Sequence, residues 1–155
     1  MFQAFGELGY RLKTTVGSFE PFANLAYVNL DTDSFTETGG AAALRGRSTT
    51  TDLTFTTLGI HAELAINIGA VNLTIDSTVG WRHAFGDTIP ALALAFNGSD
   101  AFTITGVPIA EDAAIIEAGV GVELTPNAAL GLAYQGQIAD GSAQHGVKGD
   151  LRIRF

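Results

Sequence analysis

The residues with the greatest catalytic potential in this chain are its three histidines, and they stand far apart. His61, His83 and His145 show no HxxxH-type spacing, so a zinc site of the metalloprotease kind is not indicated. No nucleophile-elbow motif is present either. A hydrolytic set could be assembled only from partners scattered along the chain, namely Asp76, Ser77, Asp87 and Ser99. These residues therefore predict that the chain is not an enzyme.

The remaining signals for cofactors and polymeric ligands are weak. Gly119-Val120-Gly121 is a lone GxG without a third glycine or a following helix, so a dinucleotide site is not expected. Zero Cys excludes disulfides and Cys-based zinc sites. The net charge of −8, with only eight Lys plus Arg, argues against a nucleic-acid partner. We expect no cofactor, no metal and no nucleic acid.

Charged residues are placed most regularly at the C-terminus. Even positions are ionic and odd positions are apolar or glycine: Lys148, Asp150, Arg152 and Arg154 against Val147, Gly149, Leu151, Ile153 and Phe155. A period of two predicts a strand with one apolar and one ionic face. The alternation reaches the final phenylalanine, which would gain little in water from being aromatic. An apolar face toward lipid and an ionic face toward a wet interior explain both features.

The same two-faced pattern predicts six earlier strands, at residues 2–13, 19–30, 54–66, 71–85, 112–124 and 129–138. Phe5 is an exception, because it falls on the polar side of its segment. In the second segment the pattern blurs from Val28 onward, which we interpret as a bulge. Asp112 could cap a helix, but Gly119 and Gly121 favour a strand there.

The connections between these strands alternate in length. Residues 14–18, 67–70 and 125–128 form short turns, 31–52 and 86–111 form long loops, and 139–144 form a medium link. The first long loop could carry a strand extension near 41–44, and the second a hairpin between 92–96 and 102–109. Tight turns at one end and long loops at the other are typical of an outer-membrane barrel. The strands also match the roughly 9–11 residues that a tilted membrane strand needs.

Composition agrees with a membrane barrel or with a well-buried soluble β protein. The 155 residues are 46% hydrophobic and only 15% charged, against about 25% charged in ordinary globular domains. No apolar run approaches the roughly 20 residues of a membrane helix. Turning the ionic face of the last strand toward lipid would cost roughly 2–4 kcal/mol for each Arg or Lys at mid-bilayer. We therefore expect the ionic faces to point inward.

Several segments together resemble the C-terminal translocator domain of classical (type V) autotransporters. They are residues 2–10 (FQAFGELGY), 20–28 (EPFANLAYV), 35–44 (FTETGGAAAL), 57–59 (TLG), 80–87 (GWRHAFGD) and 154–155 (RF). The resemblance covers nearly the whole chain. It implies a barrel of twelve antiparallel strands in the outer membrane, with a linker helix in the pore, that anchors and helps to export an N-terminal passenger.

The predicted fold is therefore all-β: an antiparallel transmembrane β-barrel, of which the chain supplies about seven or eight strands. We expect residues 1–155 to correspond to the C-terminal portion of the domain, without its early strands, linker and passenger. Met1 leads directly into Phe2 with neither a basic region nor an apolar core, so no signal peptide is expected within the chain.

The resemblance and the alternation together suggest roles for individual residues. Polar residues expected to face the lumen are Glu7, Arg11, Glu20, Asn24, Arg82, Glu117, Glu123, Gln135, Lys148, Asp150, Arg152 and Arg154. An aromatic girdle is expected from Tyr10, Tyr27, Trp81 and Phe155. The resemblance implies that Val147, Leu151, Ile153 and Phe155 are a signal for the β-barrel assembly machinery. A salt-bridged wall that serves only stability is an equal alternative for the lumen residues, and a simple interfacial anchor is the alternative for Phe155.

The expected partners are outer-membrane lipid, the assembly machinery and a passenger in cis. Self-association through unpaired strand edges is left open. A different class of function also fits the pattern: a small outer-membrane barrel, or a soluble β-sandwich, that presents the loops at 31–52 and 86–111 as a binding or adhesion module. Solubility without detergent would distinguish the sandwich from a barrel.

Overall fold

The main sheet contains seven long antiparallel strands in the order β1-β3-β6-β7-β10-β11-β12. The structure, a computed structural model, describes residues 1–40, 42–69 and 71–153. The strands are β1 (Phe2–Gly9), β3 (Gly17–Thr32), β6 (Thr49–Ile68), β7 (Val71–Gly86), β10 (Asp112–Thr125), β11 (Ala128–Ala139) and β12 (Ser142–Ile153). A short strand, β2 (Leu12–Lys13), continues the pairing of β1 along β3. The all-β antiparallel class and each of the seven predicted strands are confirmed.

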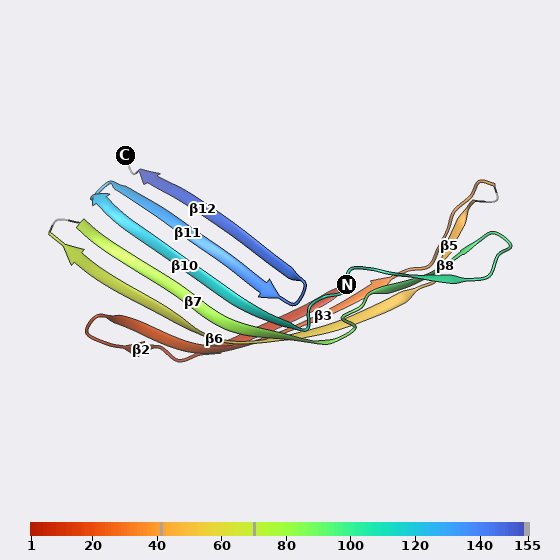
Figure 1. Cartoon of the computed structure of the whole chain (residues 1–155), viewed down its shortest axis with the longest axis horizontal. Coiled ribbons are helices and arrows are strands. Elements are labelled where there is room, and N and C mark those ends of the chain that lie inside the picture. The colour runs from red at the N-terminus through yellow and green to blue at the C-terminus, as the bar shows by residue number, and fades with distance from the viewer. Residues whose placement is uncertain (41, 70, 154–155) are drawn as a thin grey trace.

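The sheet is a single curved layer whose two edges, β1 and β12, are not joined (Figure 1). Because every neighbour in a row of seven strands is antiparallel, β1 and β12 run in the same direction. A purely antiparallel barrel alternates direction around its whole circumference. Closing this sheet in that way would therefore need an odd number of further strands.

No helix that is long and apolar enough to cross a membrane occurs among the described residues.

The two long loops pair with each other, which the sequence did not predict. They form a second sheet in the order β4-β5-β8-β9. Its strands are β4 (Phe35–Thr36), β5 (Leu44–Gly46), β8 (Ala91–Phe96) and β9 (Phe102–Thr105). This sheet extends away from one end of the main sheet instead of covering its face (Figure 1).

Most of the loop predictions hold, with corrections at the boundaries. The hairpin in the second loop is confirmed as β8 and β9, although β9 ends at Thr105. The strand in the first loop is at Leu44–Gly46, and Ala41 lies outside the described residues. The loop predicted at 31–52 is shorter than expected, because β3 extends to Thr32 and β6 already begins at Thr49.

Two further predictions were wrong in detail. The link at 139–144 is a two-residue turn, since Ala139 pairs directly with Ser142 and Gly141 has a φ of 70°. A positive φ is readily adopted only by glycine. The blurred pattern after Val28 is not a bulge, because β3 and β6 pair in one continuous register from Gly17 to Thr32.

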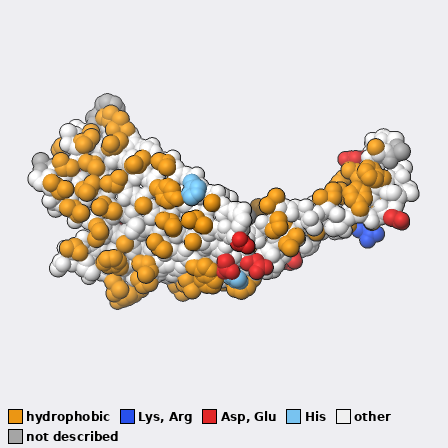
Figure 2. Space-filling view, in the orientation of Figure 1, with side chains coloured by type: hydrophobic (Ala, Val, Ile, Leu, Met, Phe, Trp, Pro, Cys, Tyr) orange, Lys and Arg blue, Asp and Glu red, His pale blue; other side chains and the backbone are white. Residues whose placement is uncertain are grey.

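Among the described residues, the main sheet has no core of the kind that soluble domains contain. In β3, every residue of the apolar side from Phe19 to Tyr27 is exposed, whereas the residues between them are half-buried. Hydrophobic side chains cover the visible face of the main sheet, and acidic side chains gather where it meets the loop extension (Figure 2). A soluble sheet shows the opposite arrangement, with its apolar face buried and its polar face wet.

Candidate functional site

The candidate site is the polar face of the main sheet. Residues directly opposite each other in antiparallel strands point to the same face. The register aligns Glu20, His61, Thr78, Glu117 and Gln135 in one row across β3, β6, β7, β10 and β11. Because side chains alternate along each strand, this row defines the polar face for the whole sheet.

The residues predicted to line a lumen share this face. The polar face carries Glu7, Arg11, Glu20, Asn24, Arg82, Glu117, Glu123, Gln135, Lys148, Asp150 and Arg152. Arg154 lies outside the described residues. The common face follows from the pairing register, and its orientation toward a lumen stays a prediction.

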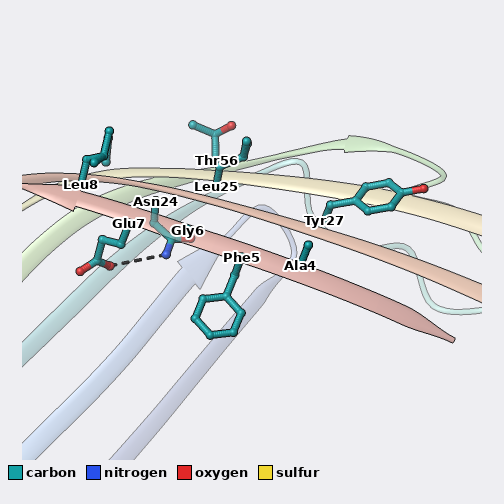
Figure 3. Close-up of a pocket in the computed structure, with 10 residues that line it drawn as sticks. Ala4, Phe5, Gly6, Glu7, Leu8, Asn24, Leu25, Tyr27 and Thr56 are labelled. Carbon is teal, nitrogen blue, oxygen red and sulfur yellow. Dashed lines mark hydrogen bonds between the residues drawn. The ribbon is translucent and has the colours of Figure 1, made fainter.

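Polar contacts join neighbouring strands on this face, and in one of them the amide of Asn72 donates to Oε2 of Glu123 at 3.0 Å. The Nε of Arg11 donates a hydrogen bond to Oε2 of Glu20 across 2.7 Å. The amide of Asn24 donates to Oε2 of Glu7 at 3.5 Å (Figure 3). The Arg11–Glu20 pair is partly exposed, so its contribution to stability in this open sheet is small.

Further polar residues of this face were not selected from the sequence. Nδ1 of His61 lies 2.8 Å from Oγ1 of Thr78, and the ring of Phe22 stacks on the His61 ring with centroids 4.2 Å apart. Glu63 and Asp76 pair with each other in the next polar row toward the short turns. Asp76 and Thr78 alternate in phase with Arg82 on β7, so the sequence carried a signal for them, whereas β6 contains no selected residue that would indicate His61 or Glu63.

Glycine makes room on the polar face for the Phe22 ring. A Cβ added to Gly59 would lie 2.6 Å from two carbon atoms of that ring and 2.8 Å from the carbonyl oxygen of Val79. The side chain of Phe22 therefore occupies the space that any larger residue at position 59 would need. The ring therefore packs directly on the backbone of β6, near the middle of the sheet.

The opposite, apolar face carries the described girdle candidates. Tyr27 pairs with Thr54, and Trp81 pairs with Leu58. The backbone N–H of Tyr10 donates to the carbonyl of Pro21, which places Tyr10 on the same face. Phe155 lies outside the described residues. Whether these rings lie at a membrane interface stays a prediction.

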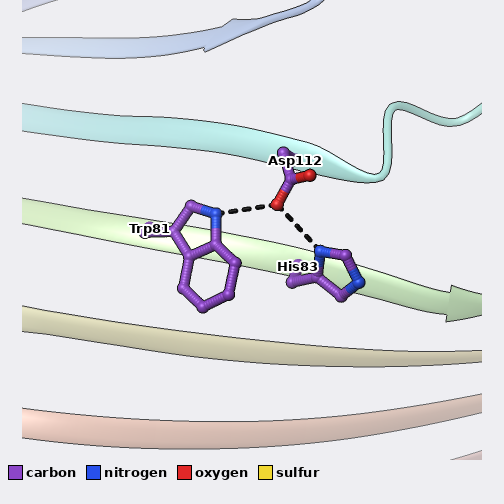
Figure 4. Close-up of polar contacts among 3 residues, drawn as sticks. All are labelled: Trp81, His83 and Asp112. Carbon is purple, nitrogen blue, oxygen red and sulfur yellow. Dashed lines mark hydrogen bonds and ion pairs between the residues drawn. The ribbon is translucent and has the colours of Figure 1, made fainter.

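Trp81 belongs to a small polar cluster near the loop end of the apolar face. Its indole N–H donates to Oδ1 of Asp112 at 2.8 Å, and Nδ1 of His83 lies 2.8 Å from the same oxygen (Figure 4). The cluster satisfies the one polar atom of the indole ring, as is usual for tryptophans at apolar–polar boundaries. This arrangement fits a girdle aromatic better than a substrate-binding platform.

The segment proposed as an assembly signal lies along the edge of the sheet. Val147 pairs with Tyr134, Leu151 with Leu130, and Ile153 with Ala128, so all three point to the apolar face. Among the described strands, β12 has a partner on one side only. Its other backbone edge therefore presents free N–H and C=O groups for strand addition.

The structure assembles no hydrolytic set from the residues considered for one. His61 contacts Thr78, His83 contacts Asp112, and His145 contacts the hydroxyl of Tyr134 at 2.8 Å. Within the described ranges, no group of three or more His, Asp or Glu side chains is arranged to hold a metal ion.

Comparisons with known proteins agree with this architecture. A family described as "Autotransporter beta-domain" matches residues 1–135. Two relatives from Serratia marcescens, both named "Extracellular serine protease", are 38% and 37% identical over 154 residues, or 99% of this chain. The chain spans 15% of the length of each of these relatives. The match lies in their C-terminal portion and does not include the protease part, so it indicates no enzyme activity for this chain.

Proposed function

Because the chain belongs to the autotransporter β-domain family, we propose that it forms part of the wall of an outer-membrane translocator for a passenger joined to it. Members of this family are outer-membrane proteins of Gram-negative bacteria. In this proposal the apolar face meets lipid and the polar face lines the path of the exported chain. The wall acts by binding and positioning, without catalytic chemistry.

The observation that carries the proposal is the inverted exposure of the main sheet. In the middle of β3 and β6 the apolar side chains are the more exposed set: Leu25, Leu58 and Ile60 are exposed, whereas Asn24, Thr57 and His61 on the polar face are half-buried. The edge strands β1 and β12 are exposed on both faces. Leu25, Leu58, Ile60, Val79 and Leu132 are all exposed on one continuous face. In water this face would drive aggregation, whereas in a bilayer it matches the hydrocarbon around it.

Cysteine labelling tests the orientation of the wall, and the 155 residues of this chain contain no native cysteine that would compete. In the complete protein that carries this chain, single cysteines at positions 148, 150 and 152 should react with a membrane-impermeant thiol reagent. Cysteines at 147, 149 and 151 should react only with a lipid-soluble reagent, because side chains alternate across a strand. Uniform labelling along the strand would contradict the proposed wall.

The polar face supports the role of a wet, chemically mixed track. Acidic residues such as Glu117 and Asp150 stand among basic ones such as Arg82, Lys148 and Arg152. Charges of both signs keep a lumen hydrated, and they do not favour passenger segments of one net charge over segments of the other. The contact of Arg11 with Glu20 shows that some of these groups also join strands.

We further propose that the last strand is recognised by the β-barrel assembly machinery. Support comes from the free edge of β12 and from the apolar row Val147, Leu151 and Ile153, which in the sequence continues to Phe155. Strand addition would use the backbone of this edge for affinity and the apolar side chains for specificity.

Deleting Phe155 should lower the outer-membrane level of the complete protein severalfold and leave its synthesis unchanged. The reason is the loss of the terminal aromatic contact with the assembly machinery. Membrane fractionation and protease accessibility of the passenger on intact cells measure the effect. Phe155→Tyr, which keeps an aromatic ring, should behave nearly as the unmodified protein. Unchanged surface levels after the deletion would remove the signal role.

The binding-module alternative has less support. A sandwich requires a second sheet over the apolar face, whereas the β4-β5-β8-β9 sheet extends beyond the end of the main one (Figure 1). This extension could still present a binding surface as an addition to the barrel. Two copies of this chain in the same membrane orientation would not close an antiparallel barrel together. Strand β12 of one copy would run parallel to β1 of the other at each junction.

A further inference from the structure

The polar face is interrupted near its loop end by a band of apolar side chains. One register row contains Phe5, Ala26, Phe55 and Ala84, in β1, β3, β6 and β7. The next row toward the loops contains Val28 and Leu53 between Gln3 and Gly86. We define the inner apolar band as Phe5, Ala26, Val28, Leu53, Phe55 and Ala84.

Independent contacts place the band on the polar face. Phe5 points to the side of Glu7 and Asn24, opposite Leu8 and Tyr27 (Figure 3). The guanidinium of Arg82, a polar-face residue, lies over the Phe55 ring, 5.4 Å from its centroid. Phe5 was the one exception to the alternation of its segment, and the register now explains it as a member of this band.

The band separates two parts of the polar face with different chemistry. The row adjoining it on the side of the short turns contains Glu7, Asn24, Thr57 and Arg82. From the Phe5 row toward the long loops, the described residues of this face in β1, β3, β6 and β7 include no charged side chain. The apolar band therefore lies at the mouth from which the long loops extend.

The packing of the band differs along its length. Leu53 is only 8% exposed and Ala84 only 3%, so β6 and β7 hold a tightly packed apolar surface here. Phe5 is 86% exposed, and none of the described residues covers its ring. The two phenylalanines stand on either side of the small Ala26, and the Phe55 ring is half-buried beneath the Arg82 guanidinium.

From this arrangement we propose that the inner apolar band is a hydrophobic constriction at the loop end of the lumen, which hinders the passage of hydrated ions. The proposal rests on the translocator function and adds a barrier to it. Apolar constrictions oppose ion flow because water withdraws from them and ions cannot keep their hydration shells. A polypeptide can pass by contacting the rings with its own side chains.

Ion conductance of the complete protein in planar lipid bilayers, with the passenger released, tests the barrier. The double variant Phe5→Ser/Phe55→Ser should raise the single-pore conductance severalfold, because hydroxyl groups would hold water in the constriction. Phe5→Leu/Phe55→Leu keeps the band apolar and should leave the conductance close to that of the unmodified protein. Phe19→Ser removes an aromatic ring from the opposite, apolar face of β3 and should also leave the conductance nearly unchanged.

The outcomes are distinguishable. Unchanged conductance in a serine variant that still migrates as a folded, heat-modifiable barrel overturns the constriction, as does an equal rise with leucine. If the double serine variant does not fold, the near-isosteric Val28→Thr replaces it, with the same expected direction and the same overturning result. If the unmodified protein neither inserts nor displays its passenger, the proposed translocator function is wrong. If export is normal but the serine variant leaves the conductance unchanged, only the constriction is wrong.

Discussion

Replacing Leu132 with arginine should destabilise the membrane-inserted protein by about 2–4 kcal/mol, the cost of an arginine on the lipid face at mid-bilayer. Leu132 lies near the middle of β11, on the apolar face, between Val120 and Gly149 on the neighbouring strands. Its neighbours on this face, Val120, Leu130, Tyr134 and Gly149, carry no negative charge, so none of them would neutralise the new one. Urea unfolding in lipid vesicles, followed by the heat-modifiable shift on gels, measures the loss.

Gln135→Arg is the matched control for this change. Gln135 is on the same strand but on the polar face, paired with Glu117. An arginine there would meet water and a carboxylate, so we expect a change in unfolding free energy within about 0.5 kcal/mol. Equal effects at positions 132 and 135 would show that the two faces do not meet different solvents, and the assignment of the apolar face to lipid would be wrong.

Gly59→Val should destabilise the protein by about 1–3 kcal/mol, as overpacking of a filled site does. The new side chain would meet the Phe22 ring and the carbonyl of Val79 at distances below 3 Å. The Phe22 ring is also stacked on His61, so moving it away from position 59 would disturb that contact. The same unfolding measurement, with the fraction of protein assembled in the outer membrane, reports the effect.

The control for this substitution is Gly121→Val on the same polar face. A Cβ at Gly121 would have no atom within 4 Å, so the added methyl groups meet open space. Valine also has the higher strand preference, so we expect no loss of stability at this site. The double variant Phe22→Ala/Gly59→Val should recover part of the stability lost at Gly59, since the clashing ring is gone. If the double variant is as unstable as Gly59→Val alone, the clash with the backbone carbonyl of Val79, and not the Phe22 ring, causes the loss of stability.

The sequence predicted the strands well because side-chain alternation is a local property. In 145–155 and in 19–27 the period of two assigns each residue to a face without knowledge of any partner strand. The same alternation assigns the residues of β6 and β11 to two faces. The register of these strands with β3 and β10 places the residues on the same faces. The failures have the same origin. Beyond Val28 the positions of the apolar face are occupied by the polar residues Asn29 and Asp31. This change interrupts the alternation without any shift in register, so the prediction of a bulge was wrong.

The polar face could be predicted only in part. Glu7, Arg82 and Lys148 stood out from the sequence because a charge opposite apolar neighbours is a strong local contrast. In the sequence His61 stands out only as a possible catalytic residue and Thr78 does not stand out, and both became part of the polar face when the register brought them together. Phe5 and Phe55 are separated by fifty positions, and no periodicity within either segment relates them. Their common row exists because both strands pair with β3.

The sequence by itself thus determined the all-β class, the seven two-faced strands and the choice of face for nearly every side chain. These follow from the covalent geometry of an extended chain, which points successive side chains to opposite sides. Only the tertiary structure decided which residues are neighbours across strands: the pairing of the two long loops through β5 and β8, the Phe22 ring over Gly59, and the inner apolar band. Those contacts depend on register and on loop closure between distant segments, and neither is recorded in the alternation of a single strand.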